Sequence, residues 1–137
     1  AGVAPGAAGK DEIEFNFLGQ YPRAVQVNYF ANGQGGHEAI IPLKFDATKE
    51  VHDYAFEWLP NKIRWFVDGV LVHETPDGAV LPKNAGAIYL SLWSGAPKQN
   101  DRLGVFSYTA PVYAEIVWAG YTQGDAICRF PLSMRCK

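Results

Sequence analysis

Three polar side chains alternate with apolar ones in residues 11–19, which read DEIEFNFLG. Glu12, Glu14 and Asn16 fall on one face of an extended strand, because successive side chains point to opposite sides. The two glutamates lie about 7 Å apart along such a strand. On an exposed sheet this pattern is ordinary, whereas on a central strand it is typical of a cleft lined by carboxylates.

Paired carboxyl groups at this spacing suit the cleavage of a glycosidic bond. Retaining hydrolysis uses one carboxylate as the nucleophile and a second carboxyl group as general acid and then general base, about 5–5.5 Å apart. One strand supplies both if it curves and the side chains lean together. The pattern by itself leaves two interpretations open, an exposed strand face and a glycosidase-like site.

The rest of the sequence is dominated by strand signals, and helical periodicity is hard to find. Short apolar runs end at turn residues such as Pro60-Asn61 and Asp68-Gly69. We predict strands within residues 11–19, 24–31, 37–45, 54–60, 61–69, 70–74, 87–95 and 112–121. Their spacing predicts an all-β antiparallel sandwich or barrel. Residues 94–111 lack clear strand character, and loops of this kind often border a binding cleft.

Composition narrows the class of protein. The 137 residues are 48% hydrophobic and 19% charged, as in a folded single domain. A net charge of -2 gives no electrostatic case for nucleic acid. No apolar run is long enough to span a membrane, and residues 1–10 form a flexible head that does not resemble a signal peptide.

The two cysteines, Cys128 and Cys136, enclose a short loop near the end of the sequence. Such a pair predicts a disulfide and an oxidising compartment, with two free thiols as the alternative. Because the loop is short, the bond would mainly fix the tail.

The motif in residues 12–19, EIEFNFLG, resembles that of glycoside hydrolase family 16, which reads Glu, aliphatic, Asp, aliphatic, Glu and then Phe-Leu-Gly. The segments VQVNYFANGQGGHE, FDATKEVHDYAFEWLPNKIRWFVDG, LVHE and YLSLWSG resemble the family's bacterial β-glucanase branch. The closing CRFPLSMRC resembles the tails of exopolysaccharide glycanases in that branch. The resemblance covers residues 11–136.

This resemblance implies an antiparallel β-sandwich, the concanavalin-like jelly roll, of which the chain carries the carboxyl-terminal part and lacks the amino-terminal strands. The expected organisation is a flexible head in residues 1–10, a partial glycanase-like domain in residues 11–122, and a disulfide-bearing tail in residues 123–137. A jelly roll without those strands would expose apolar faces and unpaired edges. We therefore expect a separate amino-terminal polypeptide or a homo-oligomer to complete the sheets, with a remodelled smaller sandwich as the alternative.

The resemblance also implies roles for the motif residues. Glu12 matches the nucleophile, Glu14 the assisting Asp, and Asn16 the acid/base Glu. An amide has no proton to transfer at neutral pH and cannot act as a general base. We therefore expect impaired turnover; Glu14 acting as the acid is the alternative.

By the same resemblance, the sugar contacts are expected from Gln26, Asn28, Tyr29, His37 and Trp93. For His37, a hydrogen bond within the sheet is an equal alternative. Trp58 and Trp65 are expected in the core. Several positions depart from the family: Lys10 replaces a stacking Trp, Phe30 a Tyr, and Ser91 and Ser94 two Asn residues. Val117 replaces an Asp that helps to hold calcium, so we expect no metal, and the resemblance implies no cofactor.

Two functions follow from the resemblance. The first is an impaired retaining endo-β-glycanase acting on β-1,3/1,4-glucan or a related exopolysaccharide. The second is a non-catalytic glucan-binding or assembly protein on the same scaffold. Either would be secreted, extracellular or periplasmic; a generic lectin-like sandwich is the remote third alternative.

Overall fold

The computed structural model describes residues 9–95, 97–107 and 109–123, which divide into two compact units. Of the described residues, the first unit holds those up to Glu50 and Pro82–Glu115, and the second holds Val51–Leu81 and those from Ile116 onward. Each unit carries one antiparallel three-stranded sheet. This confirms the predicted all-β antiparallel class. No helix in the described ranges is long and apolar enough to cross a membrane.

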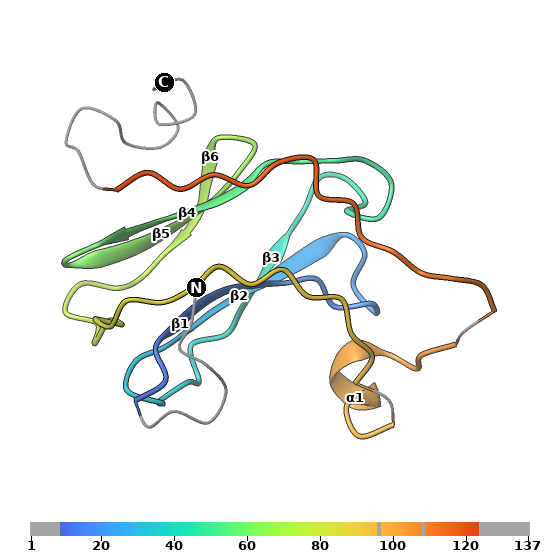
Figure 1. The fold of residues 1–137 in the computed structure, drawn as a ribbon, viewed down its shortest axis with the longest axis horizontal. Helices are drawn as coiled ribbons and strands as arrows, with labels where there is room; N and C mark the ends of the chain where they lie inside the picture. The colour runs from blue at the N-terminus through green and yellow to red at the C-terminus, as the bar shows by residue number, and fades with distance from the viewer. Residues whose placement is uncertain (1–8, 96, 108, 124–137) are drawn as a thin grey trace. The chain divides into compact units, whose positions relative to one another are not determined.

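The sheet of the first unit has the order β1, β2, β3 (Figure 1), formed by Glu12–Asn16, Ala24–Phe30 and Ala39–Pro42. Its apolar face is built by alternate residues, among them Ile13, Val25 and Val27, which are at most 3% exposed. A tight turn after β2 places Asn32 at φ 52° and Gly33 at φ 79°, the left-handed region that asparagine and glycine tolerate best. These strands and this turn agree with the sequence pattern.

The sheet of the second unit is a meander of β4 (Tyr54–Leu59), β5 (Lys62–Val67) and β6 (Val70–Glu74). Asp68 and Gly69 both have positive φ, 48° and 78°, which gives the predicted tight turn between β5 and β6. Trp65 is buried, as expected. Trp58 is 38% exposed, contrary to expectation, because it lies beside the β4–β5 turn at the end of the sheet.

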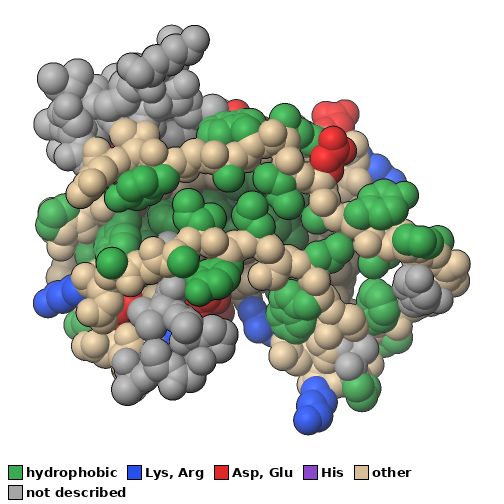
Figure 2. Space-filling view, viewed as in Figure 1, with side chains coloured by type: hydrophobic (Ala, Val, Ile, Leu, Met, Phe, Trp, Pro, Cys, Tyr) green, Lys and Arg blue, Asp and Glu red, His purple; other side chains and the backbone are tan. Residues whose placement is uncertain are grey.

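The strands predicted in residues 87–95 and 112–121 are wrong for the described chain, where neither segment is a strand and only Ala87 forms an isolated β-bridge. Consecutive side chains are exposed, whereas a strand packed on one side would bury alternate ones. The exposed residues include Ile88, Tyr89, Leu90, Leu92, Trp93, Val112, Tyr113, Ile116, Val117 and Trp118. Hydrophobic side chains are accordingly visible on the surface in Figure 2. A strand needs a neighbour for its backbone hydrogen bonds, and neither segment belongs to a sheet of the described ranges.

The stretch predicted to lack strands contains the one helix of the described chain, α1 (Asn100–Leu103). Four residues give no amphipathic period that a sequence pattern can reveal. Its position in the first unit matters for the site described next.

Candidate active site

One face of the β1–β2 ladder carries the three residues of the motif. Glu12, Glu14 and Asn16 are paired across the ladder with Phe30, Asn28 and Gln26. Directly opposite residues of antiparallel strands project from the same face. We call these six residues the carboxylate face. The alternation therefore brings together every predicted motif residue and two of the predicted sugar contacts, Gln26 and Asn28.

Glu14 is the hydrogen-bond acceptor at the centre of the carboxylate face. Its Oε2 accepts from the side-chain amide of Asn16 at 2.9 Å and from that of Asn28 at 3.2 Å. Asn28 is only 2% exposed, and its Oδ1 receives no hydrogen bond within the described part of the chain. The amide at position 16 thus donates to the neighbouring carboxylate, in the place where the family motif has a carboxyl group.

Glu12 forms an ion pair with Lys10, which also lies over the Phe30 ring with its Nζ 4.1 Å from the ring centroid. The side chains of Lys10 and Glu12 are 39% and 23% exposed, so the pair is accessible to water. The Lys10 ammonium therefore lies beside the Glu12 carboxylate at this end of the face. The sequence showed Lys10 only as a replacement for an aromatic residue.

The face is held in place from its amino-terminal edge by Asp11, which is 3% exposed. Its Oδ1 accepts from the Asn32 backbone, and its Oδ2 from the backbones of Lys83 and Asn84 and the Asn84 side chain, all at 2.7–2.9 Å. Burial would raise the pKa of Asp11, but these hydrogen bonds outweigh burial and lower it. Asp11 thereby joins the start of β1, the turn after β2 and the segment at Lys83.

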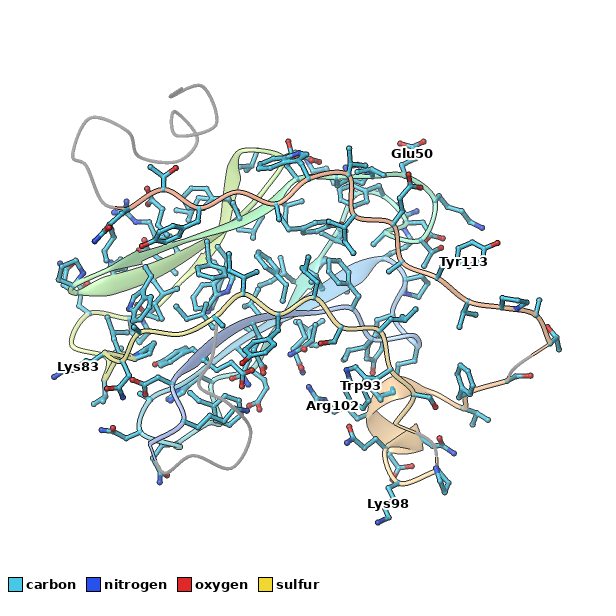
Figure 3. The ribbon with its side chains drawn as sticks, viewed as in Figure 1. Glu50, Lys83, Trp93, Lys98, Arg102 and Tyr113 are labelled. Carbon is cyan, nitrogen blue, oxygen red and sulfur yellow. The ribbon has the colours of Figure 1, made fainter. Side chains whose placement is uncertain are left out.

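At the other end of the face, Arg102 reaches from α1 to β2, where its Nη2 donates to Oε1 of Gln26 at 2.7 Å. Trp93 is 57% exposed and lies close to the same helix. Gly95 stands between them, since a Cβ placed there would lie 2.4 Å from the side chain of Leu103 in α1 and 3.1 Å from the Trp93 ring. Figure 3 labels Trp93 and Arg102 beside α1. The sequence indicated Trp93 and the loop, but not Arg102.

Tyr29 and His37 lie apart from the carboxylate face. Tyr29 is paired with Ile13, so strand alternation turns it to the opposite, apolar face, where it is 5% exposed and burial raises its pKa. The His37 ring stacks on Tyr29 with centroids 4.0 Å apart and an interplanar angle of 3°. These two residues are therefore not part of the carboxylate face.

Two further predictions concern metal and sulfur. Within the described ranges, no three His, Cys, Asp or Glu side chains gather in a way that could hold a metal ion. Cys128 and Cys136, with their predicted disulfide, lie outside the described residues.

The described chain is thus an antiparallel all-β protein that carries two glutamates, Glu12 and Glu14, on one face of the β1–β2 ladder. The sequence matches the family described as glycosyl hydrolases family 16 over residues 3–119. The chain belongs to this family.

Known members give the scale of the likeness. The chain is 47% identical over 112 residues to the beta-glucanase of Paenibacillus macerans, covering 82% of this chain and 46% of that protein. It is 38% identical over 127 residues to the endo-1,3-1,4-beta-glycanase ExoK of Rhizobium meliloti (strain 1021), covering 93% and 47%. The solved beta-glucanase of Bacillus licheniformis superposes with a TM-score of 0.72 at 41% identity, covering 80% and 50%. The chain thus spans about half the length of these relatives.

Proposed function

We propose that the chain forms one part of a retaining endo-β-glycanase cleft for β-1,3/1,4-glucan or a related exopolysaccharide, in which turnover is impaired at Asn16. In this proposal Glu12 is the nucleophile and Glu14 supports it. The observation that carries the proposal is the 2.9 Å hydrogen bond from Asn16 Nδ2 to Glu14 Oε2. Position 16 faces the reacting carboxylates, but it presents an N–H donor that cannot exchange a proton with a leaving oxygen.

The proposed sugar contacts are Gln26, Asn28 and Trp93. Asn28 lies on the carboxylate face and donates to Glu14 Oε2 at 3.2 Å, so it belongs to the same array of polar side chains. The exposed Trp93 ring offers a flat apolar surface for the face of a pyranose ring.

An activated aryl β-oligoglucoside tests the nucleophile directly, because its leaving group needs no acid and azide can replace the missing base. We expect mass spectrometry to detect a β-glycosyl azide with the wild-type chain and none with Glu12→Gln. No product from the wild type, with or without azide, would remove the enzymatic part of the proposal.

Restoring the carboxyl group tests the acid/base. Asn16→Glu should raise hydrolysis of unactivated β-glucan by roughly 10²–10⁴-fold, the usual contribution of general acid–base catalysis. Reducing-end release measures this rate. Asn61→Glu, which adds the same charge in the exposed β4–β5 turn, is the matched control and should have no effect.

A non-catalytic glucan-binding or assembly role is the second candidate. It is favoured by the Lys10–Glu12 ion pair, which occupies the proposed nucleophile. Binding of β-glucan without any glycosyl azide would select this role.

We also propose that the amino-terminal part of the domain covers the exposed apolar residues between Ile88 and Trp93. The exposure of these apolar side chains and the existence of relatives about twice as long support this covering. We further propose that the protein acts outside the cytoplasm with Cys128 and Cys136 bonded. Light scattering on the purified chain tests the partner: a stable dimer would assign the surface to a second copy instead. Thiol titration under denaturing conditions should detect no free thiol.

A further inference from the structure

Helix α1 is fixed against the turn that follows β1. The Gln20 backbone N–H donates to the Leu103 carbonyl at 3.0 Å, and the Gln20 side chain donates to the Asp101 carbonyl at 3.2 Å. Gly19 permits this approach, since a Cβ there would lie 3.1 Å from the Leu103 carbonyl oxygen. The base of the Arg102 side chain therefore has a defined position in the first unit.

From that position the Arg102 guanidinium projects over one end of the carboxylate face. It binds Oε1 of Gln26, which is 8% exposed and therefore itself held in a buried site. Gln26 is the ladder partner of Asn16, so their Cα atoms are about 5 Å apart. Arg102 itself remains exposed, and Figure 3 labels it beside α1.

On this face the negative charges have partners within the protein, whereas the positive charge of Arg102 is bound only to a neutral group. Glu12 is paired with Lys10, and Glu14 Oε2 is held by two amide groups. The Arg102 guanidinium forms no ion pair with any described carboxylate, and it donates to Gln26, a neutral amide. The end of the face formed by Asn16 and Gln26 thus carries a positive charge beside uncharged amides.

We infer that Arg102 determines specificity by binding a carboxylate substituent of the polysaccharide at this end of the face. A guanidinium has five N–H donors in a planar array that matches the two oxygens of a carboxylate, whereas a neutral hydroxyl leaves its charge unused. The inference rests on the proposed sugar cleft and deepens it by naming an acidic rather than a neutral β-glucan as the preferred ligand.

The amide at position 16 contributes to this preference. A glutamate there would place a carboxylate on the same face, directly opposite Gln26 in the ladder, where it would compete for Arg102. The neutral Asn16 leaves the guanidinium available for a ligand carboxylate.

The test compares soluble β-1,3/1,4-glucan with the same polymer partly oxidised to carboxylates at C6, using isothermal titration calorimetry with the whole chain. We expect the oxidised polymer to bind about 10-fold more tightly, as one charge-assisted bidentate contact implies. Arg102→Gln should abolish the difference, Arg102→Lys should keep part of it, and Asn16→Glu should reduce it.

Arg23→Gln is the control, because Arg23 is also exposed and binds a backbone carbonyl, that of Lys44, at 2.7 Å. It should leave the preference unchanged. Equal affinity of the wild type for the two polymers, no binding of the oxidised one, or an equal loss in both arginine variants would overturn the inference. The proposed function can fail while this inference stands. In that case the oxidised polymer binds through Arg102, but the neutral glucan does not bind and no glycosyl azide forms. This result would refute only the glycanase assignment.

Discussion

Replacement of Asp11 by asparagine tests how far the first unit depends on one buried carboxylate. Asp11 accepts four hydrogen bonds, one at Oδ1 and three at Oδ2. An asparagine has a single oxygen, so its NH₂ group must face at least one of the N–H donors that now bind Asp11. The best orientation keeps the three contacts at the Oδ2 position in neutral form and turns the fourth into a repulsive pair.

The loss in the free energy of unfolding follows from the lost charge and from the one N–H donor that no longer has an acceptor. Hydrogen bonds to charged groups contribute about 1.5–3 kcal/mol each, and neutral ones about 0.5–1.5 kcal/mol. Weakening three and losing one would lower the free energy of unfolding by about 3 kcal/mol, after partial relaxation of the surrounding loops. Small domains have about 5–15 kcal/mol in total, so this is a large fraction.

Urea unfolding followed by tryptophan fluorescence measures the effect at pH 7, with the exposed Asp101→Asn as the matched control, expected within about 0.5 kcal/mol of wild type. The pKa of Asp11 is lowered from 3.8, so its contribution is complete above that value and is lost as the pH falls through the folded-state pKa. The difference between wild type and Asp11→Asn should therefore shrink in acid. A loss below about 1 kcal/mol, or a difference that persists unchanged at low pH, would refute the reasoning.

Three further measurements address other residues. Lys10→Met removes the cation beside Glu12. Because both side chains are partly exposed, the free energy of unfolding should change by less than about 1 kcal/mol. Labelling of Glu12 by an activated fluoroglycoside should become faster, and slower labelling would contradict the proposed role of Glu12. Burial and then Asp68 raise the pKa of Tyr54 to about 12, so absorbance titration should show a late-ionising tyrosine whose pKa falls in Asp68→Asn. The contribution of the neutral Tyr54 side chain to the free energy of unfolding should be complete below pH 10. It should be lost as the pH rises through the folded-state pKa of about 12. Trp93→Ala should leave urea unfolding unchanged within about 1 kcal/mol but weaken β-glucan binding about 3- to 10-fold; a large stability loss would instead place Trp93 in the core.

Local patterns predicted what depends on neighbours in sequence. The alternation in residues 11–19 was enough to put Glu12, Glu14 and Asn16 on one face, because the strand period is a backbone property. The Asp68-Gly69 turn was also predictable from the local sequence, because both residues tolerate positive φ. Alternation also explains the placement of Tyr29, which the resemblance had grouped with residues of the other face.

Contacts between distant segments could not be predicted. Asp11 binds Asn84, 73 residues further on, and Arg102 binds Gln26 across 76 residues. Nothing in either local sequence specifies these partners. The irregular segment between Ile88 and Trp93 shows the converse: its strand propensity is strong, but it belongs to no sheet of the described chain.

In the proposed function, position 16 affects stability and turnover in opposite directions. A glutamate there would stand beside Glu14, and two ionised carboxylates at this distance repel each other, whereas the asparagine converts the contact into a 2.9 Å hydrogen bond. Asn16→Glu should therefore lower the free energy of unfolding by about 1–2 kcal/mol even as it restores turnover. Raising the acidity of the solution should recover part of that loss, because protonating one carboxyl group allows the two to share a proton. A variant that gains activity without losing stability would show that Glu14 and position 16 do not interact in this way, and that the amide was not what stabilised the face.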